Sequence, residues 1–259
     1  MVRKPGLTGE DAGSRGGSRV QSVERAAQVL DGLIVAEHTL TALELSRATG
    51  IHRTNVHRLL RTMRDIGMVR EPSPGHYDLG PATVLLGNAY VERLPVRRAA
   101  LPYLVDLSNR VVRDRPWVVA LAIPIGTDAV LIDRIWQPHA PLDSILDVGT
   151  RLPFVGSAHG RAMLSAHSPD TVAAIVGRDA ADRLAEELET SRRYGHVACS
   201  SNEFRPGISA IAVAIVDRGR HPVGSVAISG VDLESELDVD SELARHLRRA
   251  ADVIAGALP

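Results

Sequence analysis

The chain has 259 residues, of which 44% are hydrophobic and 24% charged, and its formal net charge is −1. This composition excludes a disordered or fibrous chain, and the length suits two domains that each bury a core. No run of about 18 apolar residues is present and the single cysteine cannot form a disulfide within the chain, so we expect a cytoplasmic protein with no membrane partner.

The N-terminal segment, residues 1–20, is rich in Gly, Ser and Arg and has no apolar periodicity, which predicts a mobile tail. Ser22 is a favourable N-cap residue. Apolar residues then recur at helical spacing as far as Ile34, which predicts a first helix from Ser22 to about Ala36.

A second, shorter helix is predicted from Thr41 to Gly50. Thr41 and Glu44 have the T-x-x-E spacing of a capping box, and Gly50 suits the backbone turn that ends a helix. We expect the buried side of this helix to consist of Leu40, Leu43, Leu45 and Ala48.

A third helix and a hairpin follow directly. The apolar residues that predict the core face of the helix are Val56, Leu59, Leu60, Met63 and Ile66. Gly67 ends the helix, and two short extended segments then flank the turn at Pro74 and Gly75, as in a β-hairpin. Three helices followed by a hairpin predict a winged helix-turn-helix domain over residues 21–80.

Basic residues are concentrated in this segment, since residues 47–70 contain six arginines and one acidic residue. In a helix-turn-helix the second helix of the motif enters the major groove of DNA. We expect Thr54, Asn55 and Arg58 to contact bases or phosphates, Arg53 and Arg61 to neutralise phosphates, and Gly75 to carry the wing tip towards the DNA. The alternative is a structural helical bundle whose arginines are a solvated face.

Residues 82–94 predict a short helix whose apolar stripe its own domain does not cover, and we interpret residues 81–95 as a linker that helps to pair two subunits. The remaining residues, 96–259, predict an α+β domain with an antiparallel sheet and helices on one side of it. Strands are predicted at 117–125, 129–135, 142–148, 208–217 and 222–230, and helices at 96–111, 158–166, 180–193 and 240–258.

Enzyme motifs are not found. The sequence lacks a phosphate-binding loop and an H-E-x-x-H zinc motif, and its ten histidines form no compact ligand cluster, so we expect neither a cofactor nor a metal.

A candidate ligand site is predicted in the C-terminal region. Residues 152–161 run from a strand end into a helix N-terminus, where free amides favour an anion. Hydroxyls and small residues near 202–210 and at Ser229 fit a small carboxylate site, although these residues taken alone favour ordinary turn chemistry. A rival hypothesis is a small-molecule hydrolase with an appended DNA-binding domain, using His159, Glu203 or Cys199.

The chain from residue 22 to 258 resembles the IclR family of bacterial transcriptional regulators. The residues that carry this resemblance include Leu43-Glu-Leu45, Gly50-Ile51, the run Thr54 to Leu60, Tyr77 to Gly80, Gly149 to Pro153, Ala158 to Ala162, Arg193 to Gly195, Glu203, and Gly207 to Ala212.

The resemblance implies a winged-helix domain, a linker helix and a GAF/PAS-like effector-binding domain. It also implies a homodimer or tetramer that binds a palindromic, double-stranded DNA operator and responds to a small organic acid. Positions that match the effector pocket of the family are Ser157, Ala158, His159, Asn202, Ala210 and Ser229.

Overall fold

The computed structural model describes residues 20–36 and 38–259, so the predicted tail lies outside the described residues except for Val20. The chain forms two compact units, one ending at Tyr90 and the other beginning at Val91. None of the described helices is both long and apolar enough to cross a membrane.

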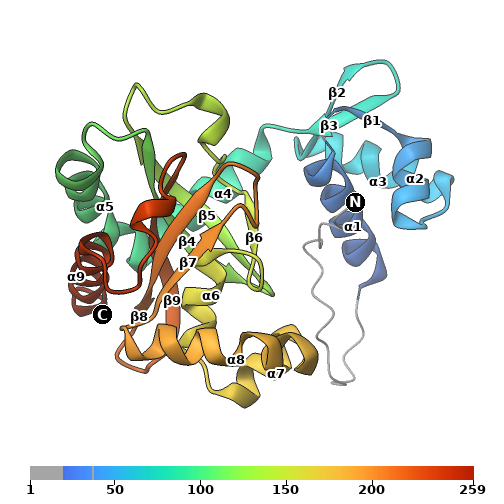
Figure 1. Ribbon diagram of the computed structural model, residues 1–259. Helices are drawn as coiled ribbons and strands as arrows, with labels where there is room; N and C mark the ends of the chain where they lie inside the picture. The colour runs from blue at the N-terminus through green and yellow to red at the C-terminus, as the bar shows by residue number, and fades with distance from the viewer. Residues whose placement is uncertain (1–19, 37) are drawn as a thin grey trace. The chain divides into compact units, whose positions relative to one another are not determined.

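The described part of the N-terminal unit begins with three helices and a small antiparallel sheet (Figure 1). Its helices are α1 (Gln21–Val35), α2 (Ala42–Thr49) and α3 (Arg53–Asp65), and its strands are β1 (Leu40–Thr41), β2 (Val69–Ser73) and β3 (His76–Leu79). Strands β2 and β3 form the predicted hairpin, the wing. The two-residue strand β1 was not predicted; it pairs with β3 and so ties the start of α2 to the wing.

The predicted capping box at α2 is confirmed. The Thr41 hydroxyl accepts a hydrogen bond from the Glu44 amide at 3.3 Å, and the Glu44 carboxylate accepts one from the Thr41 amide at 2.7 Å. Gly50 ends α2 in the left-handed conformation at φ 72°, as expected for a glycine C-cap. The predicted N-cap at Ser22 is wrong, because α1 begins at Gln21 after Val20 and has no side-chain cap.

The core of this unit is formed by Val29, Leu33, Leu45, Val56, Leu60 and Met63 together with residues of the hairpin. Three residues predicted to be buried are exposed. Leu43 and Ala48 point outwards because Ala42 and Leu45, three residues apart, form the buried face of α2. Ile66 is the C-cap of α3, beyond the last core-facing turn, and is 60% exposed.

Helix α4 (Ala82–Arg93) contains the boundary between the two units and buries none of its residues. Its apolar side chains Val84, Leu85, Leu86 and Tyr90 are each more than half exposed.

The C-terminal unit is built on one antiparallel sheet of six strands in the order β6-β5-β4-β9-β8-β7. The strands are β4 (Trp117–Ile125), β5 (Asp128–Trp136), β6 (Arg151–Pro153), β7 (Val197–Ser201), β8 (Ser209–Val216) and β9 (Pro222–Gly230). Strands β6 and β7 were not predicted. The strand predicted at residues 142–148 is wrong: a 3₁₀ turn at Leu142–Ser144 leads into irregular chain, and the sheet is instead extended by β6.

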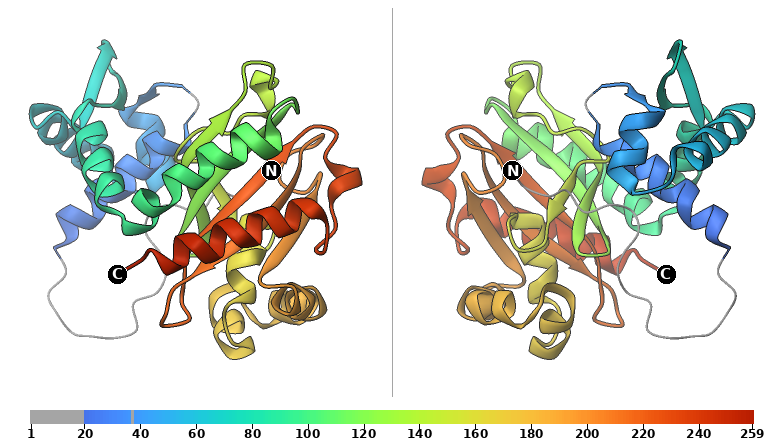
Figure 2. Two further views of the ribbon diagram at one scale, coloured as in Figure 1. Left: turned by 90° about the vertical axis from the view of Figure 1, so that its left-hand side faces the viewer. Right: turned by 90° about the vertical axis from the view of Figure 1, so that its right-hand side faces the viewer.

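The helices of this unit are α5 (Pro95–Leu107), which continues as a π-helical turn (Ser108–Val112), α6 (Ala158–Ser165), α7 (Pro169–Val176), α8 (Arg178–Arg193) and α9 (Glu242–Gly256). A second 3₁₀ turn is at Glu234–Glu236, and α7 was not predicted. Helices α5 and α9 lie side by side on one face of the sheet (Figure 2), whereas α6 packs on the other face, against β8 and β9, with α8 outside it. The prediction of helices on one side only is therefore wrong.

The two faces of the sheet differ in side-chain size. Large residues such as Leu121, Ile211 and Ile228 point towards α5 and α9. Alanines, among them Ala212 and Ala227, point towards α6. Because successive residues of a strand alternate between faces, this pattern gives one face a thick apolar core and lets α6 approach the other closely.

Gly160 in α6 packs tightly against the segment that leads from β6 into this helix. A Cβ atom at Gly160 would lie 2.3 Å from Cα and 2.6 Å from the carbonyl oxygen of Phe154, which are backbone atoms that cannot rotate away. The segment that leads from β6 into α6 therefore requires glycine at this position.

We expect Gly160→Ala to lower the free energy of unfolding of the C-terminal unit by about 1–3 kcal/mol or more, through overpacking. The control is Gly256→Ala, at the end of α9, where an added Cβ meets nothing within 4 Å; this change should be neutral or stabilise by up to about 1 kcal/mol. Urea unfolding followed by tryptophan fluorescence measures both, since Trp117 and Trp136 are the two tryptophans of the chain. Equal stability of the two variants would contradict the packing argument.

Candidate functional site

Helix α3 presents a basic outer face. His52 caps the helix, its ring nitrogen accepting from the Thr54 amide at 3.4 Å. At 100° per residue, Thr54, Arg58 and Arg61 lie opposite the buried residues Val56, Leu60 and Met63, and all three are exposed. The helix therefore offers a hydroxyl and two guanidinium groups on one solvent-facing strip.

The other predicted contact residues of α3 lie beside this strip. Arg53 is exposed, and its Nε lies 3.4 Å from His57 Nε2. Asn55 is half-buried and lines a groove with the first residues of α1, a groove that Arg58 also borders. His57, which sequence reasoning missed, is exposed on the strip's edge.

The arginines of this unit differ in whether an acid already neutralises them. Arg64 forms an ion pair with Glu71 of the wing, and Arg70 pairs with Asp78 at 2.5 Å. Arg58 and Arg61 have no carboxylate partner among the described residues, and neither have Arg25, Arg47 and Arg53. Three of these five unpaired arginines lie on α3, so this helix carries much of the charge available to a polyanion.

The wing tip is the turn at Pro74 and Gly75, where Gly75 has φ 74° and open space around it. The Gly75 amide donates to the Glu71 carboxylate at 2.8 Å, and this bond together with Arg64 holds the pKa of Glu71 below its ordinary value. Gly75 thus shapes the tip, while its N–H group is occupied within the wing.

The C-terminal unit contains a small cavity between the small-residue face of the sheet, the N-terminal end of α6 and the loop that joins β7 to β8. Its floor follows one register row across four strands, in which Ser200 faces Ala210, Ala210 faces Ser229, and Ser229 faces Val118. The rest of the lining is Ala120, Leu131, Leu146, Leu152, Ser157, Ala158, His159, Phe204, Arg205 and Ile208.

The cavity has a volume of about 40 Å³. A single water molecule needs roughly 10–15 Å³ of such space. The space thus suits a few waters, and an aromatic acid would require Phe204 or its loop to move outwards.

Two of the polar lining residues are already engaged. Ser157 caps α6 by accepting from the Gly160 amide at 3.1 Å, and its hydroxyl donates to the Pro153 carbonyl at 2.8 Å. His159 is buried, with Nδ1 2.6 Å from the Ser225 hydroxyl, and burial lowers its pKa to about 4, so the ring is neutral at pH 7.

Five of the six residues predicted for the effector pocket line this cavity: Ser157, Ala158, His159, Ala210 and Ser229. Asn202 is not part of the lining. It adopts φ 58°, accepts from the Gly207 amide at 2.6 Å and donates to Glu234 at 2.5 Å, so it closes the base of the β7–β8 loop. Sequence reasoning missed Ser200, Phe204 and Arg205. The alternation of β7 would have revealed Ser200 if that strand had been recognised.

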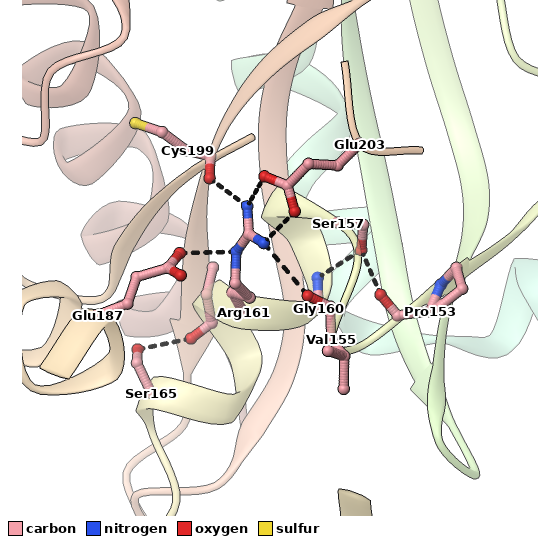
Figure 3. Close-up of polar contacts among 10 residues, drawn as sticks. Pro153, Val155, Ser157, Gly160, Arg161, Ser165, Glu187, Cys199 and Glu203 are labelled. Carbon is pink, nitrogen blue, oxygen red and sulfur yellow. Dashed lines mark hydrogen bonds and ion pairs between the residues drawn. The ribbon is translucent and has the colours of Figure 1, made fainter. Parts of the chain in front are cut away.

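A buried arginine fixes the β7–β8 loop against α6 (Figure 3). Arg161 is 4% exposed, and its two terminal nitrogens lie 2.5 and 2.7 Å from the Glu203 carboxylate. The same side chain donates to the carbonyl of Cys199 at 2.5 Å, and its Nε lies 2.7 Å from Glu187. Hydrogen bonding from Arg161 lowers the pKa of Glu203, which keeps this carboxylate ionised.

The groups of the hydrolase hypothesis do not form a catalytic chain. His159 contacts Ser225, and Glu203 is bound by Arg161. Burial raises the pKa of the Cys199 thiol to about 11, so it is protonated at neutral pH and a poor nucleophile. Nor do the described residues contain a group of three or more His, Cys, Asp or Glu side chains placed to hold a metal ion.

Comparison with known proteins identifies both units. Residues 22–73 match the IclR helix-turn-helix domain, and residues 88–255 match the C-terminal domain of the bacterial transcriptional regulator IclR. The chain is 28% identical over 249 residues to the glycerol operon regulatory protein of Streptomyces coelicolor, covering 91% of this chain and 95% of that protein.

Solved structures share the fold. An IclR family transcriptional regulator from Brucella abortus superimposes with a TM-score of 0.80 at 23% identity, over 99% of this chain and all of that one. An IclR homologue from Microbacterium hydrocarbonoxydans, solved in complex with 4-hydroxybenzoate, gives a TM-score of 0.70 at 20% identity, over 92% and 98% of the two chains. The chain therefore belongs to the IclR family of bacterial transcriptional regulators, with an N-terminal helix-turn-helix DNA-binding domain and the C-terminal domain of that family.

Proposed function

We propose that the outer strip of α3 recognises the operator and that the wing contacts the flanking backbone. The observation that carries this proposal is the pair of exposed arginines Arg58 and Arg61, which have no carboxylate partner in the described part of the chain. They lie on the helix that enters the major groove in a helix-turn-helix. Thr54 lies on the same strip and is the candidate for base contact, with Arg53 and Asn55 beside it. Because the proposed operator is bacterial DNA, the proposal includes a cytoplasmic location for the protein.

Arg58→Ala should weaken binding to a duplex that the wild-type protein selects from a random library. Loss of one phosphate-neutralising charge is expected to reduce the slope of log affinity against log salt by about one for each half-site bound, and so by about two on a palindromic operator. Fluorescence anisotropy at several salt concentrations measures affinity and slope together.

The matched control is Arg178→Ala, an exposed arginine of the C-terminal unit, which removes the same charge from the chain. It should leave both quantities unchanged. If the two variants behave alike, the DNA does not lie on the outer strip of α3.

The cavity of the C-terminal unit is proposed as the site of a small organic acid that changes operator affinity. Its support is the convergence of Ser157, Ala158, His159, Ala210 and Ser229 around one space on the small-residue face. We assign residues 21–80 to DNA binding, 81–95 to the linker and 96–259 to effector binding. A ligand shifts the operator affinity only if it binds the DNA-competent and incompetent states differently.

Titration with carboxylic acids, 4-hydroxybenzoate among them, should change operator affinity, and the acid should be recovered chemically unchanged. Ala210→Phe, which fills the middle of the cavity floor, should abolish this response while leaving the affinity for DNA without acid intact. Anisotropy of the labelled operator measures the response. An unaltered response in Ala210→Phe would place the effector elsewhere.

We also propose that α4 pairs two copies of the chain, as dimer or tetramer, on a palindromic operator. The support is its row of exposed apolar residues, Val84, Leu85, Leu86 and Tyr90. Symmetric pairing presents two recognition helices to two half-sites.

Leu85→Glu should shift the protein towards monomer in sedimentation velocity and weaken operator binding. The control is Leu142→Glu, at a residue of the C-terminal unit that is 82% exposed, and it should preserve the assembly. An assembly unaffected by Leu85→Glu would exclude α4 from the interface.

A further inference from the structure

Arg205 stands out among the residues that line the cavity of the C-terminal unit. It lies on the loop between β7 and β8, is itself exposed, and is the one Lys or Arg of the lining. Its Nη1 donates to the backbone carbonyl oxygen of Asp143 at 2.5 Å. Sequence reasoning gave it no role.

The charge of Arg205 is not neutralised by an acid. Two other arginines near the cavity are neutralised by acids. Arg161 pairs with Glu203, and Arg134 pairs with Asp147 at 3.0 Å. Within the described part of the chain, Arg205 has no carboxylate within 4.0 Å. A carbonyl oxygen is a weaker partner for a guanidinium than a carboxylate, which can accept two hydrogen bonds and carries the opposite charge.

The other polar groups of the lining are neutral. Ser200 and Ser229, on the cavity floor, have hydroxyls without a hydrogen-bond partner among the described residues. Most of the remaining lining is apolar. The cavity therefore combines one uncompensated cation at its loop side with free hydroxyls on its floor and an apolar wall.

The backbone on both sides of Arg205 is anchored. Glu203 is held by Arg161, and the Gly207 amide is held by the Asn202 side chain at 2.6 Å. The guanidinium can thus exchange its partner through side-chain rotation, without refolding of the loop.

Building on the effector site proposed above, we propose that Arg205 determines the specificity of this site for monocarboxylates with an apolar body. On binding, its guanidinium leaves the Asp143 carbonyl and takes the carboxylate of the acid. The apolar body occupies the space that Phe204 vacates, and the hydroxyls of Ser200 and Ser229 receive a polar substituent where one is present.

The test compares acids with their neutral amides on the full-length protein by isothermal titration calorimetry. The probes are 4-hydroxybenzoate, phenylacetate and hexanoate, each beside its primary amide. A hydrogen-bonded charge pair corresponds to about a tenfold to hundredfold preference in affinity. We expect the wild-type protein to prefer at least one acid over its amide by that factor.

Arg205→Gln should remove the preference, because only the charge pair is lost. The affinity for the acid should fall, and the affinity for the amide should stay within about threefold of the wild-type value. Arg205→Lys should restore part of it, since the charge remains without the two-pronged geometry. The control Arg218→Gln, on the exposed β8–β9 turn, should behave as wild type.

Two results would overturn the assignment of Arg205. One is an acid preference that survives Arg205→Gln, and the other is failure of all three acids to bind the wild-type protein. Ala210→Phe separates this inference from the effector site itself. If Ala210→Phe abolishes acid binding while Arg205→Gln does not, the cavity is the site and Arg205 is not its selector. If Ala210→Phe binds acids as wild type does, the cavity is not the site.

Discussion

The difference in side-chain size between the two faces of the six-stranded sheet is the constraint on which the C-terminal unit depends. Valine, leucine and isoleucine towards α5 and α9 build the main core, while alanine and serine on the opposite side let α6 approach closely. The close approach of α6 brings its N-cap, Ser157, to the edge of the same small residues. A cavity remains where the row from Ser200 to Val118 runs beyond the helix. The alternation of large and small side chains therefore supplies both the main core of the unit and the cavity that we propose as the effector site.

The sequence predicts most of the N-terminal unit because its signals are local. The Thr41 and Glu44 cap, the glycine at position 50 and the periodicity of α3 are each determined by neighbouring residues. Burial of Leu43 and Ile66 was predicted wrongly because an apolar residue near a helix end fits two faces equally well. In the C-terminal unit the failures are non-local. Strands β6 and β7 are short edge strands that exist through pairing with β5 and β8, and periodicity carries little of that information. For the same reason the family resemblance predicted the residues of the candidate site that lie on α6, β8 and β9. It did not predict the position of Arg205, which depends on how the loop between β7 and β8 folds over the sheet.

Arginines have two distinct uses in this chain, and their partners separate them. Arg64 and Arg161 are bound by carboxylates and fix the positions of the wing and of the β7–β8 loop. Arg58, Arg61 and Arg205 lack such partners in the described structure, and they lie on the surfaces that we propose for binding a phosphate or carboxylate from outside the chain. A count of basic residues does not distinguish these uses, since the total charge of the chain is close to zero. The two uses are distinguished by whether a carboxylate is paired with each arginine side chain.

The small volume of the cavity has a consequence for how such a regulator senses concentration. With the effector site that we propose, binding includes the free energy of displacing Phe204, and the apparent dissociation constant equals the intrinsic one divided by the open fraction. The threshold at which the gene responds is then set by two independent quantities, the contacts to the acid and the ease of opening. Substitutions in the loop that never touch the acid can retune the threshold, so related regulators can keep one ligand and yet respond at different cellular levels of it.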